Sequence, residues 1–170
     1  GDVYKRQDRM RNIFKEKRIR PDIIEASLSS HINDNFLELY KKTLVMNKFI
    51  SRDLGKNAVS TYRRAYNIID REKNISKSGP DAVLFKQDEE KELFDKINDI
   101  RKAFTYKERK ESYENHLKLL SDAKVSTDKF FDNVKVNDEN NDIKNNRLEL
   151  LQRLCSTFNT FIDFSKLEGN

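Results

Sequence analysis

The sequence predicts an all-α fold, a helical bundle of about seven or eight helices. Apolar residues recur at intervals of three and four along most of the chain, which is the pattern of helices that each bury one face and not the alternation of a strand. Only four Gly and two Pro occur in 170 residues, whereas sandwiches and barrels use such residues at most of their turns. Charged residues make up 37% of the chain, but both signs are present and the net charge is only +5, so the composition favours a folded helical protein.

Four helices are predicted in the first half of the chain. Residues 1–7 lack an initiating Met and resemble a translated sequencing adapter, so we expect them to be an artefact and leave them out of the fold. Pro21 suits the first position of the second helix, where its missing N–H is harmless. Asn33 or Asp34 can cap the third helix. The predicted helices span residues 8–17, 21–28, 33–50 and 56–73.

A connector at residues 74–87, which contains the only Gly-Pro pair, separates these helices from those of the second half. Acidic residues open the next helix, where they suit the positive end of the helix dipole. A T-x-x-E capping box at Thr105–Glu108 predicts the start of another helix, and Ser126 or Thr127 can cap a short one. Residues 143–165 carry the longest apolar stripe and predict the last helix.

Residues that support catalysis or metal binding are scarce. The chain has no phosphate-binding or dinucleotide-binding glycine motif and no zinc-protease or serine-hydrolase motif. The single cysteine, Cys155, lies in the apolar stripe of the last predicted helix and is expected to be an inert core thiol. His31 and His116 are too few for a histidine-rich metal site, and we expect His116 at or near the surface. We therefore expect no catalytic residue and no metal in this chain.

Compartment and partners follow from hydropathy and charge. No stretch approaches the ~20 apolar residues that cross a bilayer, and no secretory signal follows the basic N-terminus, so we expect a cytoplasmic protein with no membrane partner. Residues 1–87 have a net charge of +8 and residues 88–170 one of −3. A basic half suggests a polyanionic partner, most often nucleic acid, although lysine-rich helices are often merely solvated.

The polar face of the predicted helix 56–73 is the best candidate for binding. Tyr62, Ala65, Tyr66 and Ile69 can face inward, which leaves Ser60, Arg63 or Arg64, Asn67 and Arg71 along the outward face. Arginine offers paired donors to phosphates and base edges, asparagine offers a donor and an acceptor, and tyrosine can stack on an unpaired base. These are the side chains that a single-stranded RNA loop requires. A polar face that only stays hydrated is the alternative.

Motifs along the chain resemble those of one family. The matching segments are Phe130-Phe131-Asp132-x-Val134-x-Val136-Asn137, Asn146-Arg147-Leu148-x-Leu150-Leu151-x-x-Leu154, Phe158, Asp163-x-Ser165-x-Leu167, Arg63-Arg64-x-x-Asn67-Ile68, Asp8-Arg9-Met10-Arg11-x-x-Phe14 and Asp22-Ile23-Ile24-x-Ala26. Their order and spacing over residues 8–168 are similar to the C-terminal part of bacterial glycyl-tRNA synthetase β subunits, which ends in an anticodon-binding domain of the DALR type.

The resemblance implies a helical bundle of the DALR type at residues 53–168, with residues 8–52 forming the end of the preceding helical region. It implies tRNA binding for a glycine–tRNA ligase built from two α and two β subunits, so the expected partners are tRNA-Gly and the α subunit, with no DNA. ATP and Mg²⁺ would be bound by the α subunit, and this fragment would bind tRNA without a cofactor and without catalysing a step.

The candidate tRNA-binding residues are Tyr62, Arg63, Arg64, Asn67, Arg71, Asn146 and Arg147. Asn146 and Arg147 begin the last helix, so capping and a structural ion pair are a second interpretation for them. Asp163 and Ser165 are expected to fix the C-terminal turn. Two alternatives to the glycyl enzyme are the related domain of an arginyl-tRNA synthetase and a helical protein-interaction module without RNA binding.

Overall fold

The computed structural model describes residues 1–30, 35–107 and 113–169, and over these residues it contains α-helices and short 3₁₀ helices but no strand. The α-helices are α1 (Asp2–Glu16), α2 (Pro21–Ser30), α3 (Phe36–Ile50), α4 (Asp53–Ile69), α5 (Asp88–Lys107), α6 (Tyr113–Ser121), α7 (Lys124–Asn133) and α8 (Asn141–Asn159). The 3₁₀ helices are η1 (Ala82–Leu84) and η2 (Phe164–Lys166). The predicted all-α class and helix number are therefore confirmed.

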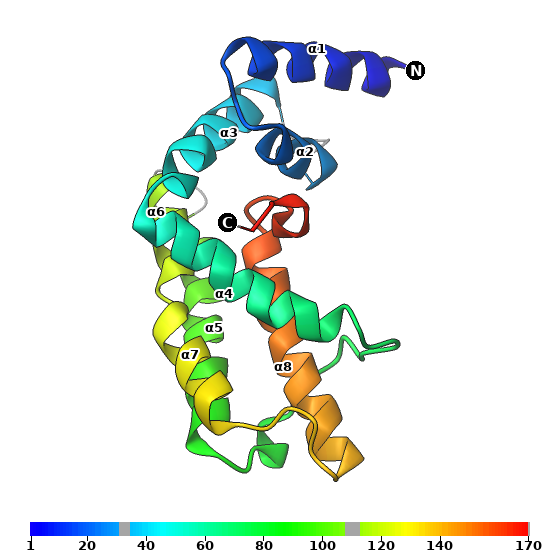
Figure 1. The fold of residues 1–170 in the computed structure, drawn as a ribbon, viewed down its shortest axis with the longest axis vertical. Helices are drawn as coiled ribbons and strands as arrows, with labels where there is room; N and C mark the ends of the chain where they lie inside the picture. The colour runs from blue at the N-terminus through cyan, green and yellow to red at the C-terminus, as the bar shows by residue number, and fades with distance from the viewer. Residues whose placement is uncertain (31–34, 108–112, 170) are drawn as a thin grey trace.

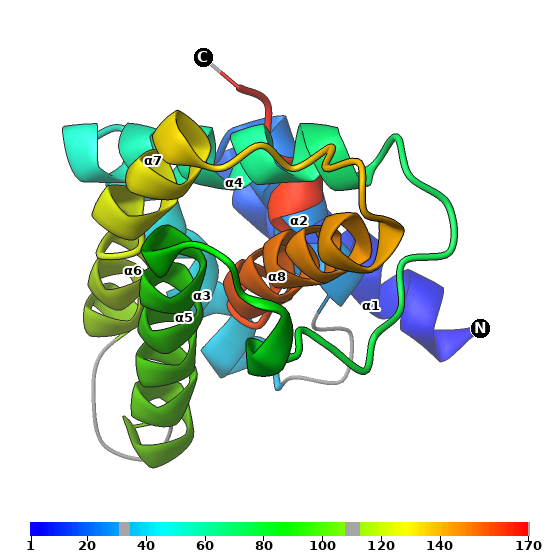
Figure 2. The ribbon, with the colours of Figure 1, turned by 90° about the horizontal axis from the view of Figure 1, so that it is seen from below.

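Helices α4 and α8 form the centre of the molecule. They pack extensively against each other, α3, α6 and α7 also contact α4, and α5 lies against both α7 and α8 (Figure 1). Seen from below, α5, α6 and α7 stand beside α8 while α4 crosses over its end (Figure 2). Buried apolar side chains from α1 to η2 join into one core. The largest that are fully buried include Phe14, Tyr62, Phe130, Phe158 and Phe164.

Helix α4 follows α3 so closely that residue 55 has to be glycine. A Cβ atom at Gly55 would lie 1.9 Å from the carbonyl oxygen of Phe49 and 2.9 Å from the Cα of Ile50, which are both backbone atoms. Any larger residue would push the first turn of α4 away from α3. This contact fixes the direction in which α4 leaves α3.

Three predicted helix starts differ from the structure. Asn33 and Asp34 lie outside the described residues, and α3 is capped by Asn35, whose Oδ1 accepts a hydrogen bond from the Glu38 amide at 2.8 Å. Thr105 does not begin a helix because α5 continues through Lys107. Its proposed partner in the capping box, Glu108, lies outside the described residues.

The start of α7 also differs from the prediction. Neither Ser126 nor Thr127 is its cap, because α7 already begins at Lys124. The Thr127 hydroxyl instead donates to the carbonyl of Ala123 at 2.7 Å, which is how a threonine inside a helix satisfies its polar group. Short polar residues near a helix start therefore predicted the helix but not its first residue.

The last helix is shorter than predicted, and the chain turns back after it. Helix α8 ends at Asn159, whose side chain accepts a hydrogen bond from the Phe164 amide at 2.9 Å. Asp163 Oδ1 accepts from both the amide and the hydroxyl of Ser165, at 3.1 and 2.6 Å, so the predicted role of this pair in the C-terminal turn is confirmed. The turn places η2 against α2.

Helix α1 begins at Asp2 and so includes most of residues 1–7, which we had set aside. Of the two histidines, His31 lies outside the described residues. His116 is buried on α6, with its ring 5.1 Å from that of Phe104, which corrects the expectation of a surface position. Among the described residues, no helix has the length and apolar character to cross a membrane, and no cluster of His, Cys, Asp and Glu has the makings of a metal site.

Cys155 is buried in α8, and burial raises the pKa of its thiol to about 12. The thiolate is the reactive form, so its fraction at pH 8 is roughly 10³-fold below that of a free cysteine. We expect iodoacetamide to label Cys155 very slowly in the folded chain and rapidly in 6 M guanidinium chloride, as measured by mass spectrometry. Equal labelling rates in the two states would show that the thiol is accessible.

Candidate nucleic-acid interface

Helix α4 turns one face toward the core and the opposite face toward solvent. Tyr62 and Ala65 are buried against neighbouring helices, whereas Ser60, Arg64 and Asn67 are exposed. Residues spaced three and four apart share one face of a helix, so the three polar side chains form a continuous row. The division of α4 into an apolar inner face and a hydrogen-bonding outer face agrees with the sequence pattern.

The outer face of α4 lines a hollow of about 520 Å³ that also touches the C-terminal residues Glu168 and Gly169. We call it the α4 hollow. Its polar and charged lining residues are Lys56, Asn57, Ser60, Arg63, Arg64, Asn67 and Glu168. Three cations and one carboxylate give it an excess of positive charge. Its size is within the ~300–1,000 Å³ of most ligand pockets, and its donors and charge suit phosphates and base edges.

Arg64 is the best-presented cation of the α4 hollow. Its guanidinium carbon lies 4.4 Å above the centre of the Phe131 ring on α7, which holds the side chain in place through a cation–π contact. The side chain is 49% exposed, and its Nη1 lies 3.9 Å from Asp128 Oδ1. Asp128 is paired more closely with Lys124, one turn before it on α7. Arg64 is therefore oriented but not neutralised.

Arg63 has a different environment. It is half-buried, and its Nη2 donates a hydrogen bond to the carbonyl oxygen of Leu167, while Gly169 passes so near that a Cβ there would lie 3.0 Å from Arg63 Cδ. Its Nε is buried and has no hydrogen-bond partner among the described residues. Arg63 thus holds the C-terminal segment against α4 while lining the hollow.

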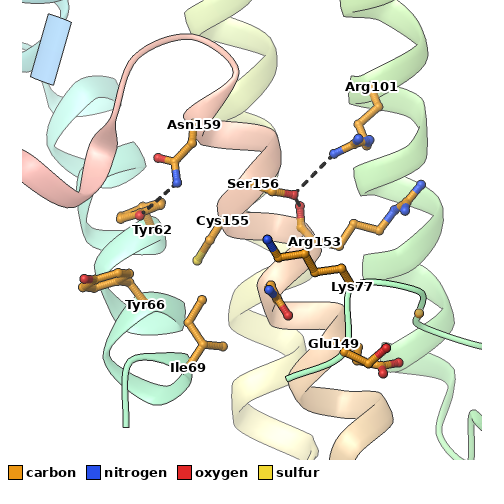
Figure 3. A pocket seen from close by; sticks show the side chains of 13 residues that line it. Tyr62, Tyr66, Ile69, Lys77, Arg101, Glu149, Arg153, Cys155, Ser156 and Asn159 are labelled. Carbon is orange, nitrogen blue, oxygen red and sulfur yellow. Dashed lines mark hydrogen bonds between the residues drawn. The ribbon is translucent and has the colours of Figure 1, made fainter. Parts of the chain in front are cut away.

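Tyr62 does not offer a stacking face, which corrects its place among the candidate residues. Only 1% of the residue is exposed, and its ring packs against Phe158, Phe164 and Tyr66 at centroid distances of 5.5 to 5.9 Å. Burial raises the pKa of its hydroxyl, which accepts a hydrogen bond from Asn159 Nδ2 at 3.3 Å (Figure 3). Tyr66 is half-buried and remains the one tyrosine of α4 with a partly open ring.

Arg71 is exposed, but it lies beyond the end of α4, which stops at Ile69 and not at Lys73. The turn that follows contains Asn74 in the left-handed region, with φ of 65°. Arg71 is therefore on the turn next to the outer face and not in the helical row that we predicted.

Arg147 is a structural residue, which corrects its place among the candidate tRNA-binding residues. It is 3% exposed, its Nε donates to Glu90 Oε1 at 2.9 Å, and its Nη1 donates to the Lys135 carbonyl at 2.6 Å. Glu90 is fully buried, and its other oxygen accepts the amides of Lys86 and Gln87. The pair links the first turn of α5 to α8 and leaves Arg147 no donor for a tRNA.

Asn146 is the second correction of this kind, because its amide is used inside the protein. It is 2% exposed, its Oδ1 accepts the Asp81 amide at 2.7 Å, and its Nδ2 donates to the Asp81 carbonyl at 3.0 Å. These two bonds mimic a backbone pairing and fix the connector before η1 onto α8. The structural interpretation of Asn146 and Arg147 therefore replaces RNA contact.

Sequence reasoning missed Lys56 and Asn57 in the α4 hollow. The signal for Lys56 is present, since Lys56, Ser60, Arg64 and Asn67 continue one row of the helix. The polar row was followed only from Ser60 onward. Asn57 lines the rim and has no such signal.

Comparison with known families and proteins agrees with the geometry. Residues 58–166, from the first half of α4 to η2, match the family described as the DALR anticodon binding domain. The glycine–tRNA ligase beta subunit of Rhodospirillum centenum is 32% identical over 167 residues, which is 95% of this chain and 23% of the relative. The protein of the same name from Rickettsia africae is 33% identical over 159 residues, or 92% of this chain and 24% of the relative. The chain thus spans about a quarter of the length of these curated relatives.

Proposed function

Because the chain belongs to the DALR anticodon-binding domain family, we propose that it binds the anticodon loop of a tRNA through the α4 hollow. The observation that carries this proposal is the cationic row on α4, which lies inside the segment that matches the family and is open to solvent. Phosphate contacts would come from Lys56 and Arg64, and base edges would meet Asn67 and Asn57.

We further propose that the tRNA is tRNA-Gly and that the chain is the C-terminal part of a glycine–tRNA ligase β subunit. The names of the relatives from Rhodospirillum centenum and Rickettsia africae favour the glycyl enzyme over the arginyl alternative. In the whole enzyme, which would act in the cytoplasm, an α subunit would supply the site for ATP and Mg²⁺ and pair with β in an α2β2 assembly. This chain would supply tRNA affinity and no catalytic group.

Arg64→Ala is expected to weaken binding of a tRNA-Gly transcript by ~1–3 kcal/mol if the guanidinium reads a base, and by less if it meets a phosphate. Filter binding or fluorescence anisotropy measures the change. Lys91→Ala is the matched control, since Lys91 is exposed on α5 and does not line the α4 hollow, so it removes the same charge elsewhere. Circular dichroism shows whether both variants are folded.

Anticodon-swapped tRNA and salt separate the roles. A base-reading Arg64 makes the loss in Arg64→Ala depend on the anticodon, whereas a phosphate contact lowers the slope of log affinity against log salt by about one. Equal losses in Arg64→Ala and Lys91→Ala would contradict the placement of tRNA on the α4 hollow. A chain that binds tRNA-Gly no better than an unrelated RNA, at any salt concentration, would contradict the proposed function as a whole.

A further inference from the structure

A second pocket lies on the other side of α4, between α4, the connector after it, α5 and α8 (Figure 3). Its volume is about 440 Å³, and we call it the α8 pocket. Its lining residues are Tyr62, Tyr66, Ile69, Ser76, Lys77, Gly79, Arg101, Glu149, Gln152, Arg153, Cys155, Ser156 and Asn159. None of these residues belongs to the α4 hollow, so the two are separate.

One end of the α8 pocket is cationic. Arg101 reaches Ser156 and Thr157 from α5, with Nη1 to oxygen distances of 3.5 and 3.0 Å, and Lys77 extends from the connector across α8 (Figure 3). Arg153 lies next to Arg101, and its guanidinium is bound to the neutral Asn98 side chain at 3.2 and 3.3 Å. Three cations of three different elements therefore meet around one helix.

These cations are not balanced by carboxylates at their own end. Among the described residues, no ion pair joins Lys77 or Arg153 to an acidic side chain. Burial, followed by the nearby charge of Arg153, lowers the pKa of Arg101, as expected where two guanidinium groups share a pocket wall. An anion placed between them would relieve this repulsion, and the Ser156 hydroxyl beside it adds a donor.

The other end of the pocket accepts hydrogen bonds. Glu149, Gln152, Ser156 and Asn159 follow one another on α8 at spacings of three, four and three, so they form one row. Glu149 lies two turns before Ser156, or about 10 Å along the helix axis. Gln152, between them, has a buried Oε1 atom without a hydrogen-bond partner among the described residues. A buried acceptor left unpaired costs about 1–3 kcal/mol, so this atom favours a ligand that brings a donor.

The walls between the two ends are apolar and aromatic. The Tyr66 ring is stacked on Tyr62 with 5.6 Å between centroids, and Ile69 and Cys155 lie beside them (Figure 3). A flat heterocycle packs well on such a wall. An anionic group at one end, a flat ring in the middle and a hydrogen-bond donor at the other end together describe a nucleotide whose base carries an exocyclic amino group.

We propose that the α8 pocket binds one unstacked nucleotide of an RNA strand, with its phosphate at Lys77 and Arg101 and the amino group of cytosine or adenine at Gln152 and Glu149. The inference rests on the proposed function, since it assigns a second contact to a chain that binds RNA on α4. Uracil presents a carbonyl oxygen where cytosine has its amino group. That oxygen would face the Glu149 carboxylate and the unpaired Gln152 oxygen, so uridine nucleotides are rejected.

The test is a titration of the 170-residue chain with CMP and UMP, which have the same charge, followed by isothermal calorimetry and by ¹⁵N–¹H NMR shifts. CMP is expected to bind at least about tenfold more tightly than UMP and to shift residues of α8 and the connector. Equal affinities for CMP and UMP, or shifts confined to other surfaces, would overturn the proposal. The trinucleotide r(CCC) should bind more tightly than CMP, and the reverse order would assign the pocket to a free nucleotide and overturn the RNA assignment.

Variants separate the two ends of the pocket. Gln152→Leu removes the unpaired oxygen without leaving a new polar atom, so it should reduce the CMP preference while UMP affinity changes less. Lys77→Ala changes an exposed side chain outside any helix, so folding is not at risk, and it should weaken CMP and UMP equally by several-fold. A CMP preference that survives Gln152→Leu unchanged, or a Lys77→Ala variant with full affinity, would contradict the assignment.

The two RNA sites fail independently. If CMP does not bind selectively while Arg64→Ala still weakens tRNA binding, the α8 pocket assignment is wrong and the function proposed for α4 stands. If CMP binds selectively but Arg64→Ala leaves tRNA affinity unchanged, the α8 pocket stands and the placement of tRNA on the α4 hollow is wrong.

Discussion

Arg147→Ala is expected to lower the free energy of unfolding by about 3–5 kcal/mol, because it leaves the fully buried Glu90 carboxylate without its charged partner. It also frees the Lys135 carbonyl, which Arg147 Nη1 binds at 2.6 Å. A domain of this size is stable by only about 5–15 kcal/mol, so the loss is a large share of the total. Urea denaturation followed by circular dichroism measures it.

A second substitution at Glu90 tests the cause. Glu90→Gln removes the unpaired charge and keeps an oxygen for the amides of Lys86 and Gln87. Added to Arg147→Ala, it should recover about 1–2 kcal/mol, whereas alone in the parent chain it should destabilise. If Arg147→Ala changes stability by less than 1 kcal/mol yet abolishes tRNA binding, Arg147 contacts RNA and the structural assignment is wrong.

Tyr62→Ala is expected to destabilise the chain by about 3–5 kcal/mol, since it removes a fully buried aromatic ring from the junction of α4, α8 and η2. The cavity would be lined by Phe158, Phe164 and Tyr66, whose positions are set by α8 and η2 and cannot readily close it. Thermal unfolding and urea denaturation measure the change.

Tyr62→Phe separates packing from hydrogen bonding. It keeps the ring and removes only the hydroxyl that Asn159 binds, so the expected loss is about 0.5–1.5 kcal/mol. Because the ring is buried, tRNA affinity of this variant should equal that of the parent chain at a temperature where both are folded. A selective loss of tRNA affinity in Tyr62→Phe would restore Tyr62 as an RNA contact.

Much of the candidate site was predictable because it lies on one helix. The apolar residues of α4 recur with the helical period, which fixes Ser60, Arg64 and Asn67 on the opposite face whatever α4 packs against. The local turn of Asp163 and Ser165 was predictable for a similar reason, since both its donor and its acceptor lie within three residues.

The roles of other residues depended on contacts across long stretches of sequence. Arg147 meets Glu90 across 57 positions and Asn146 meets Asp81 across 65, so neither pairing has a local signature. Helix starts were displaced for a related reason. A Ser or Thr can satisfy its hydroxyl on a backbone carbonyl one turn earlier, as Thr127 does, and so the residue type alone does not mark the cap.

The sequence by itself determined the helical class, the family and the polar face of α4, because periodicity and short motifs depend on neighbours along the chain. Only the tertiary structure decided which polar side chains are available to a ligand. Tyr62, Asn146 and Arg147 are withdrawn into the interior, while Lys77, Arg101 and Gln152 from separate segments are brought around one pocket. The physical reason is that solvent exposure and charge pairing are properties of packed surfaces, which residues distant in sequence create together.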